Sequence, residues 1–112
     1  MPKELRLRCW MNIDGEKFFG PGPAELLGFI EKEGSIAKAA KQMGMSYKKA
    51  WDIVENLNTN GKKPYVVSHK GGEKGGGAEL TGTGKAVLAR YRKLTGKLNT
   101  IIEKETELLR LI

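Results

Sequence analysis

The sequence is poor in the residues that build metal sites and catalytic centres. It has one cysteine, Cys9, and one histidine, His69, among 112 residues. A single cysteine cannot form an intramolecular disulfide, and this pair cannot supply the four protein ligands of a structural zinc site. The sequence also has no acidic cluster and no cysteine–histidine pairing, so acid–base or nucleophilic catalysis is disfavoured. We therefore predict a protein that is not an enzyme and holds no cofactor.

Long apolar runs are missing as well. No stretch approaches the roughly 18 residues needed to cross a bilayer, and the N-terminus "MPKELRLRCW" lacks the apolar centre of a signal peptide. We expect a cytoplasmic protein with no membrane partner. The length suits one domain, alone or with a long terminal element.

Basic charge is abundant and unevenly placed. Lysine and arginine total 20 against 13 acidic residues, for a net charge of +7. Residues 34–85 hold 9 basic and 4 acidic side chains, whereas residues 1–33 hold 5 and 6. A polyanionic partner is therefore plausible, and it would be attracted to the middle of the chain.

The N-terminal residues have the pattern of a β-hairpin. Leu5 to Ile13 alternate between apolar and polar positions, which is typical of a strand. Asp14-Gly15 tolerates the positive φ of a two-residue turn, so Glu16 to Phe19 should run back beside the first strand. The prolines of "GPGP" should end that second strand, because they lack the amide hydrogens of a sheet ladder.

Three helices follow. The first is predicted over Ala24–Glu33, and Ser35 can cap a short second helix that Gly44 ends. Ser46 can cap the third. The third helix has an apolar set at helical spacing, namely Tyr47, Ala50, Trp51, Val54 and Leu57. We therefore predict that Tyr47 and Trp51 are buried and anchor this helix, while Lys48 and Lys49 point outward at its first turn.

The rest of the chain reads as a second hairpin and a long helix. "YVVSH" and "AELT" are predicted strands, and Lys70–Gly77 is the predicted glycine-rich tip between them. From Thr83 to the end the chain looks helical, with an apolar seam interrupted only by Glu105. A stripe of this length favours a protein partner. The residues expected in that interface, which is a dimer interface if the partner is a second copy, are Leu5, Leu7, Tyr91, Leu94, Leu98, Ile101 and Leu108.

This order of elements is that of a winged helix-turn-helix. The predicted fold class is mainly α with small β: an N-terminal β-hairpin, a winged helix-turn-helix with a β wing, and a long C-terminal dimerisation helix. We divide the chain into a DNA-binding domain at residues 1–82 and a dimerisation helix at residues 83–112.

The third helix of this fold suits the major groove of double-stranded DNA, which admits one α-helix. Exposed lysines there can reach phosphates or base edges, and a wing can follow the phosphate backbone. Lys48→Ala and Lys49→Ala should weaken binding to the specific DNA site, or operator, and should relax base preference if either lysine reads a base. Lys74→Ala should weaken binding to all sequences alike. The residues expected to contact DNA are Ser35, Ser46, Tyr47, Lys48, Lys49, Asp52, Asn56, Lys70, Gly72 and Lys74.

Two stretches carry a family resemblance. "GPGPAELLGFIEKEGSIAKAAKQMGMSYKKAWDIVENLN", followed by "GGEKGGGAELTGTG", resembles the DNA-binding domain of ModE-type molybdate-responsive transcription regulators, which is similar to the LysR-type helix-turn-helix. The resemblance implies a winged-helix homodimer on a palindromic operator and a link to molybdate metabolism. It places Ser46, Tyr47 and Lys48 in the recognition-helix motif and Gly71–Gly77 in the wing.

The resemblance has one departure. Full-length members of the family continue into a C-terminal module that binds molybdate, and this chain has no residues left for one after Ile112. We therefore do not expect direct molybdate binding.

Other classes of protein remain as alternatives. The glycine amides near Lys70 and Lys74 could form an anion nest, as in a small molybdate- or tungstate-binding protein. A purely structural dimerisation module is a further alternative. The "GTGK" segment fails the phosphate-loop pattern, because Glu79 stands in place of the first glycine and Ala86 in place of the Ser/Thr.

Overall fold

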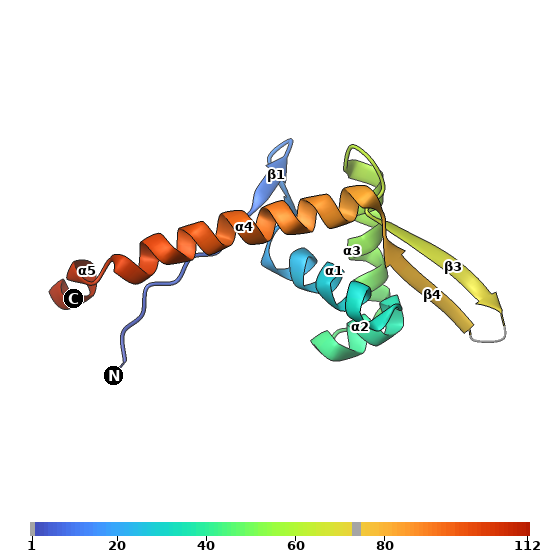
Figure 1. Ribbon diagram of the computed structural model, residues 1–112, viewed down its shortest axis with the longest axis horizontal. Coiled ribbons are helices and arrows are strands. Elements are labelled where there is room, and N and C mark those ends of the chain that lie inside the picture. Colours follow the sequence, from blue (N-terminus) through green and yellow to red (C-terminus); the bar gives the residue numbers. More distant parts are fainter. Residues whose placement is uncertain (1, 73–74) are drawn as a thin grey trace.

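The computed structural model describes residues 2–72 and 75–112, although the side chain of Lys70 lies outside the described part (Figure 1). Two hairpins and five helices are present in these ranges. They are β1 (Met11–Ile13), β2 (Glu16–Phe19), α1 (Pro21–Glu33), α2 (Ile36–Met43), α3 (Tyr47–Asn60), β3 (Val66–Gly72), β4 (Gly75–Leu80), α4 (Gly82–Lys104) and α5 (Glu107–Leu111). Helices α1 to α3 pack together under the first half of α4, and the β3–β4 hairpin extends away from them (Figure 1).

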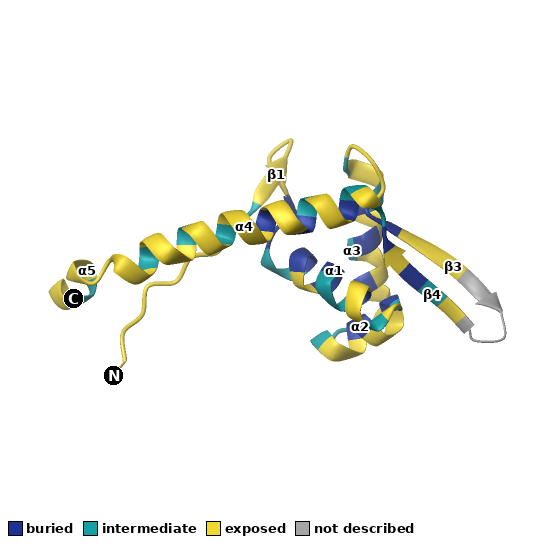
Figure 2. Ribbon diagram, viewed as in Figure 1, coloured by how far each residue is buried: buried dark blue, intermediate teal, exposed yellow. Residues whose placement is uncertain are grey.

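The core lies where these helices meet the first half of α4, as the dark segments of Figure 2 show. The Phe19 and Tyr91 rings pack edge to face with their centres 5.1 Å apart, joining the first hairpin to α4. The largest fully buried side chains are Phe19, Leu26, Leu27, Ile30 and Leu57. Burial of this apolar surface is the main source of the fold's stability.

The first hairpin confirms the predicted turn but not the predicted length of its strand. Asp14 and Gly15 both have positive φ, 50° and 79°, as a two-residue hairpin turn requires. Strand β1 is only Met11–Ile13, because residues 2–10 run without regular structure instead of pairing with β2. Alternation alone therefore overestimated the strand from Leu5.

The helix ends follow local sequence signals. Ser35 Oγ accepts a hydrogen bond from Lys38 N, and Ser46 Oγ accepts one from Lys49 N. Gly44 has a φ of 67°, a conformation that glycine adopts without strain. Helix α1 begins at Pro21, earlier than the predicted Ala24. Proline is tolerated there because amides in the first turn of a helix have no intrahelical partner.

The second hairpin is held at both ends. Ala78 N donates to Gly34 O at 2.9 Å, which joins β4 to the turn between α1 and α2. Thr81 Oγ1 donates to Pro64 O and accepts from Gly84 N, so it caps α4 while holding the loop before β3. A Cβ at Gly84 would lie 2.2 Å from Tyr65 O, so only glycine allows this close approach. The strands continue further into the predicted tip than expected, to Gly72 and from Gly75.

Helix α4 extends beyond the core and makes the molecule elongated, with extents of 59 × 31 × 21 Å. The prediction of one helix to the end of the chain was wrong: α4 ends at Lys104, and Glu105 leaves the helical conformation. The Glu105 carboxylate then accepts a hydrogen bond from Leu108 N in α5. In the described part of the chain, no helix is both long and apolar enough to traverse a bilayer.

Candidate nucleic-acid interface

The exposed surface of α3 differs from the one predicted. Ala50, Val54 and Leu57 are buried as expected, but Tyr47 is 55% exposed and Trp51 is 43% exposed. The prediction that these two rings anchor the helix was wrong. At about 100° per residue, the buried positions centre on one side of the helix, and Tyr47 and Trp51 lie on its flank. The predicted apolar stripe, which includes both rings, is wider than the side of α3 that packs against the core.

The two lysines at the start of α3 point outward, as predicted. Lys48 and Lys49 are both exposed, and Lys48 Nζ lies 3.2 Å from Asp52 Oδ2, four residues along the helix. Such exposed pairs typically contribute about 0.3–0.5 kcal/mol. The pair therefore holds Lys48 only weakly, and an anion can displace Asp52 at little cost.

A hollow of about 450 Å³ lies between the second hairpin and the starts of α2 and α3, and we call it the wing hollow. It brings the predicted residues Ser35 and Tyr47 together with residues of both β3 and β4. Its lining residues are Ser35, Ile36, Ala37, Tyr47, Ser68, His69, Gly76, Gly77 and Ala78. His69 Nε2 lies 3.2 Å from Glu79 Oε1, so these two side chains pair across the hairpin. Neither Ser68 nor His69 was predicted as a site residue.

Asn58 sets how the second hairpin meets α3. Its Oδ1 accepts hydrogen bonds from Tyr65 N and Val66 N at 2.8 and 3.1 Å, and its Nδ2 donates to Val66 O at 3.0 Å. One amide side chain thus makes three bonds to the first residues of the hairpin. Sequence reasoning missed this role. The sequence did contain a signal for it, because Asn58 is a polar residue on the same side of the helix as Tyr47 and lies next to the predicted loop.

Other predicted contact residues are more scattered. Asn56 lies next to the first hairpin, where it lines a hollow with Asp14 and Lys17, and its Oδ1 accepts a hydrogen bond from Asn60 Nδ2. It is therefore remote from the wing hollow. Gly72 is the last residue of β3, and Lys74 lies outside the described residues.

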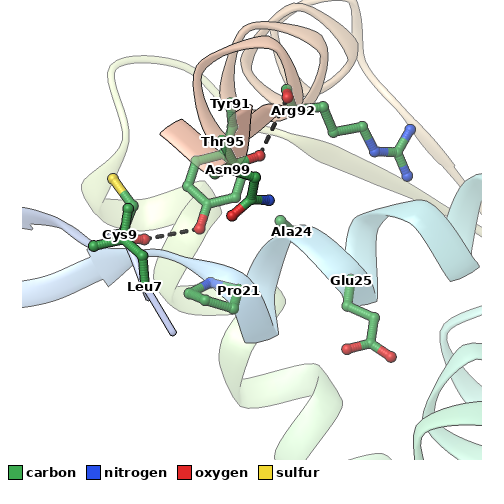
Figure 3. Close-up of a pocket in the computed structure, with 9 residues that line it drawn as sticks. All are labelled: Leu7, Cys9, Pro21, Ala24, Glu25, Tyr91, Arg92, Thr95 and Asn99. Atoms are coloured by element: carbon green, nitrogen blue, oxygen red, sulfur yellow. Dashed lines mark hydrogen bonds between the residues drawn. The ribbon is translucent and has the colours of Figure 1, made fainter. Parts of the chain in front are cut away.

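Tyr91, predicted to lie in the dimer interface, is buried in the chain's own core. It is 7% exposed, and its Oη donates to Cys9 O at 2.7 Å (Figure 3). Burial raises the pKa of the Tyr91 phenol, the Cys9 thiol adds to the increase, and Arg8 opposes it. Its hydrogen bond joins the N-terminal segment to α4, so most of the Tyr91 side chain is used within its own chain.

A hollow of about 260 Å³ lies around this bond (Figure 3). Glu25 and Arg92 stand at its edge, and Thr95 Oγ1 donates to Arg92 O. Among the described residues, no group of three or more His, Cys, Asp or Glu side chains could hold a metal ion.

The remaining residues of the predicted dimer interface are accessible. Leu94 is 43% exposed and Ile101 is 65% exposed, and Leu98 is half-buried. Leu5, Leu7 and Leu108 are exposed. Leu94 also borders a mainly apolar hollow of about 430 Å³, together with Met11 of β1.

Comparison with known proteins gives relatives named for ModE or for molybdenum. The molybdenum transport protein ModE of Azotobacter vinelandii is 42% identical over 84 residues, which are 75% of this chain and 31% of that protein. The DNA-binding transcriptional dual regulator ModE of Escherichia coli (strain K12) is 36% identical over 81 residues, 72% of this chain and 31% of that protein. The molybdenum-pterin-binding protein MopA of Rhodobacter capsulatus is 44% identical over 73 residues, which are 65% of this chain and 28% of that protein. The chain thus spans about a third of the length of these relatives. No family model matches the sequence.

Among solved structures, the crystal structure of the CbnR_DBD–DNA complex is similar, with a TM-score of 0.55 and 19% identity over 70% of this chain and 85% of that chain. This similarity confirms the predicted winged helix-turn-helix fold. Over the aligned part of its length, the chain is a homologue of the ModE transcriptional regulators, so the resemblance noted in its sequence is confirmed.

Proposed function

We propose that this chain is a sequence-specific DNA-binding transcription regulator, linked to molybdenum, that binds a palindromic operator as a homodimer. The observation that carries the proposal is the exposed first turn of α3, where Lys48 and Lys49 are exposed and the preceding residue, Tyr47, lines the wing hollow. A helix presented in this way fits a major groove, and its N-terminal residues are the ones that reach base edges. The relationship to ModE regulators supports both the DNA partner and the link to molybdenum.

The second half of α4 supports the homodimer. Beyond Tyr91 the helix leaves the core, and Leu94, Leu98 and Ile101 repeat at helical spacing with only partial cover from their own chain. Two copies of such a stripe can bury each other's apolar surface. A dimer would then hold two α3 helices at the fixed separation that a palindromic operator needs.

The first test uses DNA duplexes that the chain itself selects from a random pool. Lys48→Ala and Lys49→Ala should weaken binding to the selected duplex more than binding to random DNA, if these lysines read bases. Each should also reduce the slope of log affinity against log salt by about 1 where the lysine meets a phosphate. Lys32→Ala is the matched control, because it removes the same charge next to a hollow between α1 and α4, away from α3.

Equal losses on selected and random DNA for both α3 lysines would show that these two lysines do not read bases. Failure to select any duplex at moderate salt would overturn DNA binding itself. Calorimetry with molybdate, tungstate and sulfate then tests the alternative of a small oxyanion-binding protein.

The second test shortens the chain. Ending it after Gly96 removes Leu98, Ile101 and Leu108, and should give a monomer by sedimentation and lower affinity for the palindrome, because the two half-sites are no longer linked. Ending it after Lys104 removes α5 but keeps α4 whole, and that variant should remain a dimer. A dimer that survives truncation at Gly96 would contradict the assigned interface.

A further inference from the structure

The exposed rings of α3 need a physical reason. Trp51 and Tyr47 are large apolar side chains, and the protein leaves both about half exposed one turn apart on one side of the helix. Single exposed apolar residues are common, but two adjacent aromatic rings form a patch of the kind that marks a binding surface. Neither ring is used by the core, which Ala50, Val54 and Leu57 reach from the same helix.

The position of the patch points to DNA as its partner. Tyr47 lines the wing hollow, and Asn58, on the same side of α3, bonds to the start of β3. Trp51 lies between them on that side of the helix. Lys48 is exposed and lies three residues before Trp51, which makes it a neighbour of that ring on the helix surface, whereas Lys49 lies on the other side of the helix. One cation therefore borders the aromatic patch. A partner that meets all of these groups at once must combine negative charge with apolar contact points.

The major groove of DNA presents this combination. Phosphates line its edges, and the C5-methyl group of thymine is the apolar group on its floor. We propose that Trp51, assisted by Tyr47, contacts thymine methyl groups in the major groove and so makes this helix select for thymine at one or two positions of each half-site. This inference rests on the proposed DNA-binding function and adds a reader that sequence analysis had placed in the core.

The direct test removes single methyl groups from the DNA. Each thymine of the duplex selected by the full chain is replaced in turn by uracil, which pairs identically but lacks the methyl group. At the contacted position the wild-type chain should lose about fourfold in affinity, the value expected for one apolar carbon. Trp51→Ala should bind thymine and uracil duplexes equally at that position. Wild-type affinity that is unchanged by every uracil, or a uracil effect that persists in Trp51→Ala, would overturn the inference.

A fluorescence measurement does not depend on the stability of Trp51→Ala. The chain has two tryptophans, so Trp10→Phe leaves Trp51 as the only tryptophan and Trp51→Phe leaves Trp10, and excitation at the red edge of the tryptophan band avoids the tyrosines. Trp10 packs over Gly20, with Lys17 Nζ 4.9 Å from its ring centre, outside the wing hollow. Saturation with the selected duplex should shield Trp51 from acrylamide quenching at least several-fold more than it shields Trp10.

The outcomes separate the two proposals. A Trp10→Phe chain that binds the duplex in a gel shift, while Trp51 stays as accessible to acrylamide as in the free chain, overturns the thymine contact and leaves DNA binding intact. A chain that binds no duplex overturns the proposed function and the thymine contact with it.

Discussion

Helix α4 consists of two halves that face different surroundings. In the first half, Gly84, Leu88 and Tyr91 are buried against the hairpins and α1, and Leu88 is only 2% exposed. In the second half, Leu94 and Ile101 continue the apolar spacing but are exposed, Leu94 in part and Ile101 for the most part. The same periodic pattern therefore serves the core in one half and an open surface in the other. Periodicity shows that a helix has an apolar side, but not what covers that side.

The largest difference in stability should come from replacing one leucine by alanine in each half of α4. Leu88→Ala leaves a cavity in the core and should lower the free energy of unfolding by about 2–5 kcal/mol. Leu94→Ala removes a partly exposed side chain and should cost a monomer less than about 1 kcal/mol, while weakening the dimer. Urea unfolding at several protein concentrations measures both. Equal losses in a monomeric form would show that the halves do not differ.

A pair of glycines makes the comparison without removing apolar atoms. Gly84→Ala places a Cβ against Tyr65 O and should destabilise the fold by about 1–3 kcal/mol. Gly96→Ala meets nothing within 4 Å and should stabilise the helix by about 0.5–1 kcal/mol. Thermal unfolding should therefore shift in opposite directions for the two variants. A higher unfolding temperature for both variants would indicate that the loop before β3 does not approach α4 as closely as described.

Asn58 links α3 to the wing, and replacing it should cause a smaller loss of stability than the changes above. Asn58→Ala leaves Tyr65 N and Val66 N without their acceptor and should cost about 1–2 kcal/mol. Its effect on DNA affinity should exceed what the lost stability explains, because the wing is no longer held to α3. Asn60→Ala is the matched control, because it removes the same kind of amide from α3 but one that bonds to Asn56 and not to the hairpin. If Asn58→Ala binds DNA as well as Asn60→Ala, the wing does not depend on this anchor.

The smallest effect should appear at alkaline pH. Burial raises the pKa of Tyr65 and of Tyr91, so both phenols stay neutral in the folded chain at a pH where the unfolded chain ionises them. Stability from these groups is therefore complete below pH 10 or so and declines as pH rises beyond it. The free energy of unfolding of Tyr65→Phe should decline less steeply than that of the wild type between pH 8 and pH 11. An identical decline would mean that other groups cause the loss.

Much of the fold was predictable because its signals are local. The serine caps at Ser35 and Ser46, the left-handed glycines and the Asp14-Gly15 turn depend only on neighbouring residues. The outward direction of Lys48 and Lys49 followed from helical periodicity. The failures share a different cause. The first strand was overestimated from Leu5, and the C-terminal helix was drawn past Glu105, because alternation and periodicity do not report which partner a segment packs against.

The candidate interface shows the same division. Its lysines were predictable, but the wing hollow, the anchor at Asn58 and the exposure of Tyr47 and Trp51 were not. All of these depend on how segments distant in the sequence pack against α3.

The sequence by itself determined the order of elements, their caps and the excess of positive charge in the middle of the chain, since each follows from residues that are near one another along the backbone. Only the tertiary structure decided that Tyr91 is buried within its own chain and that Trp51 is exposed. Aromatic residues favour burial equally wherever they occur, and the packing of distant segments decides which of them the core has room to cover.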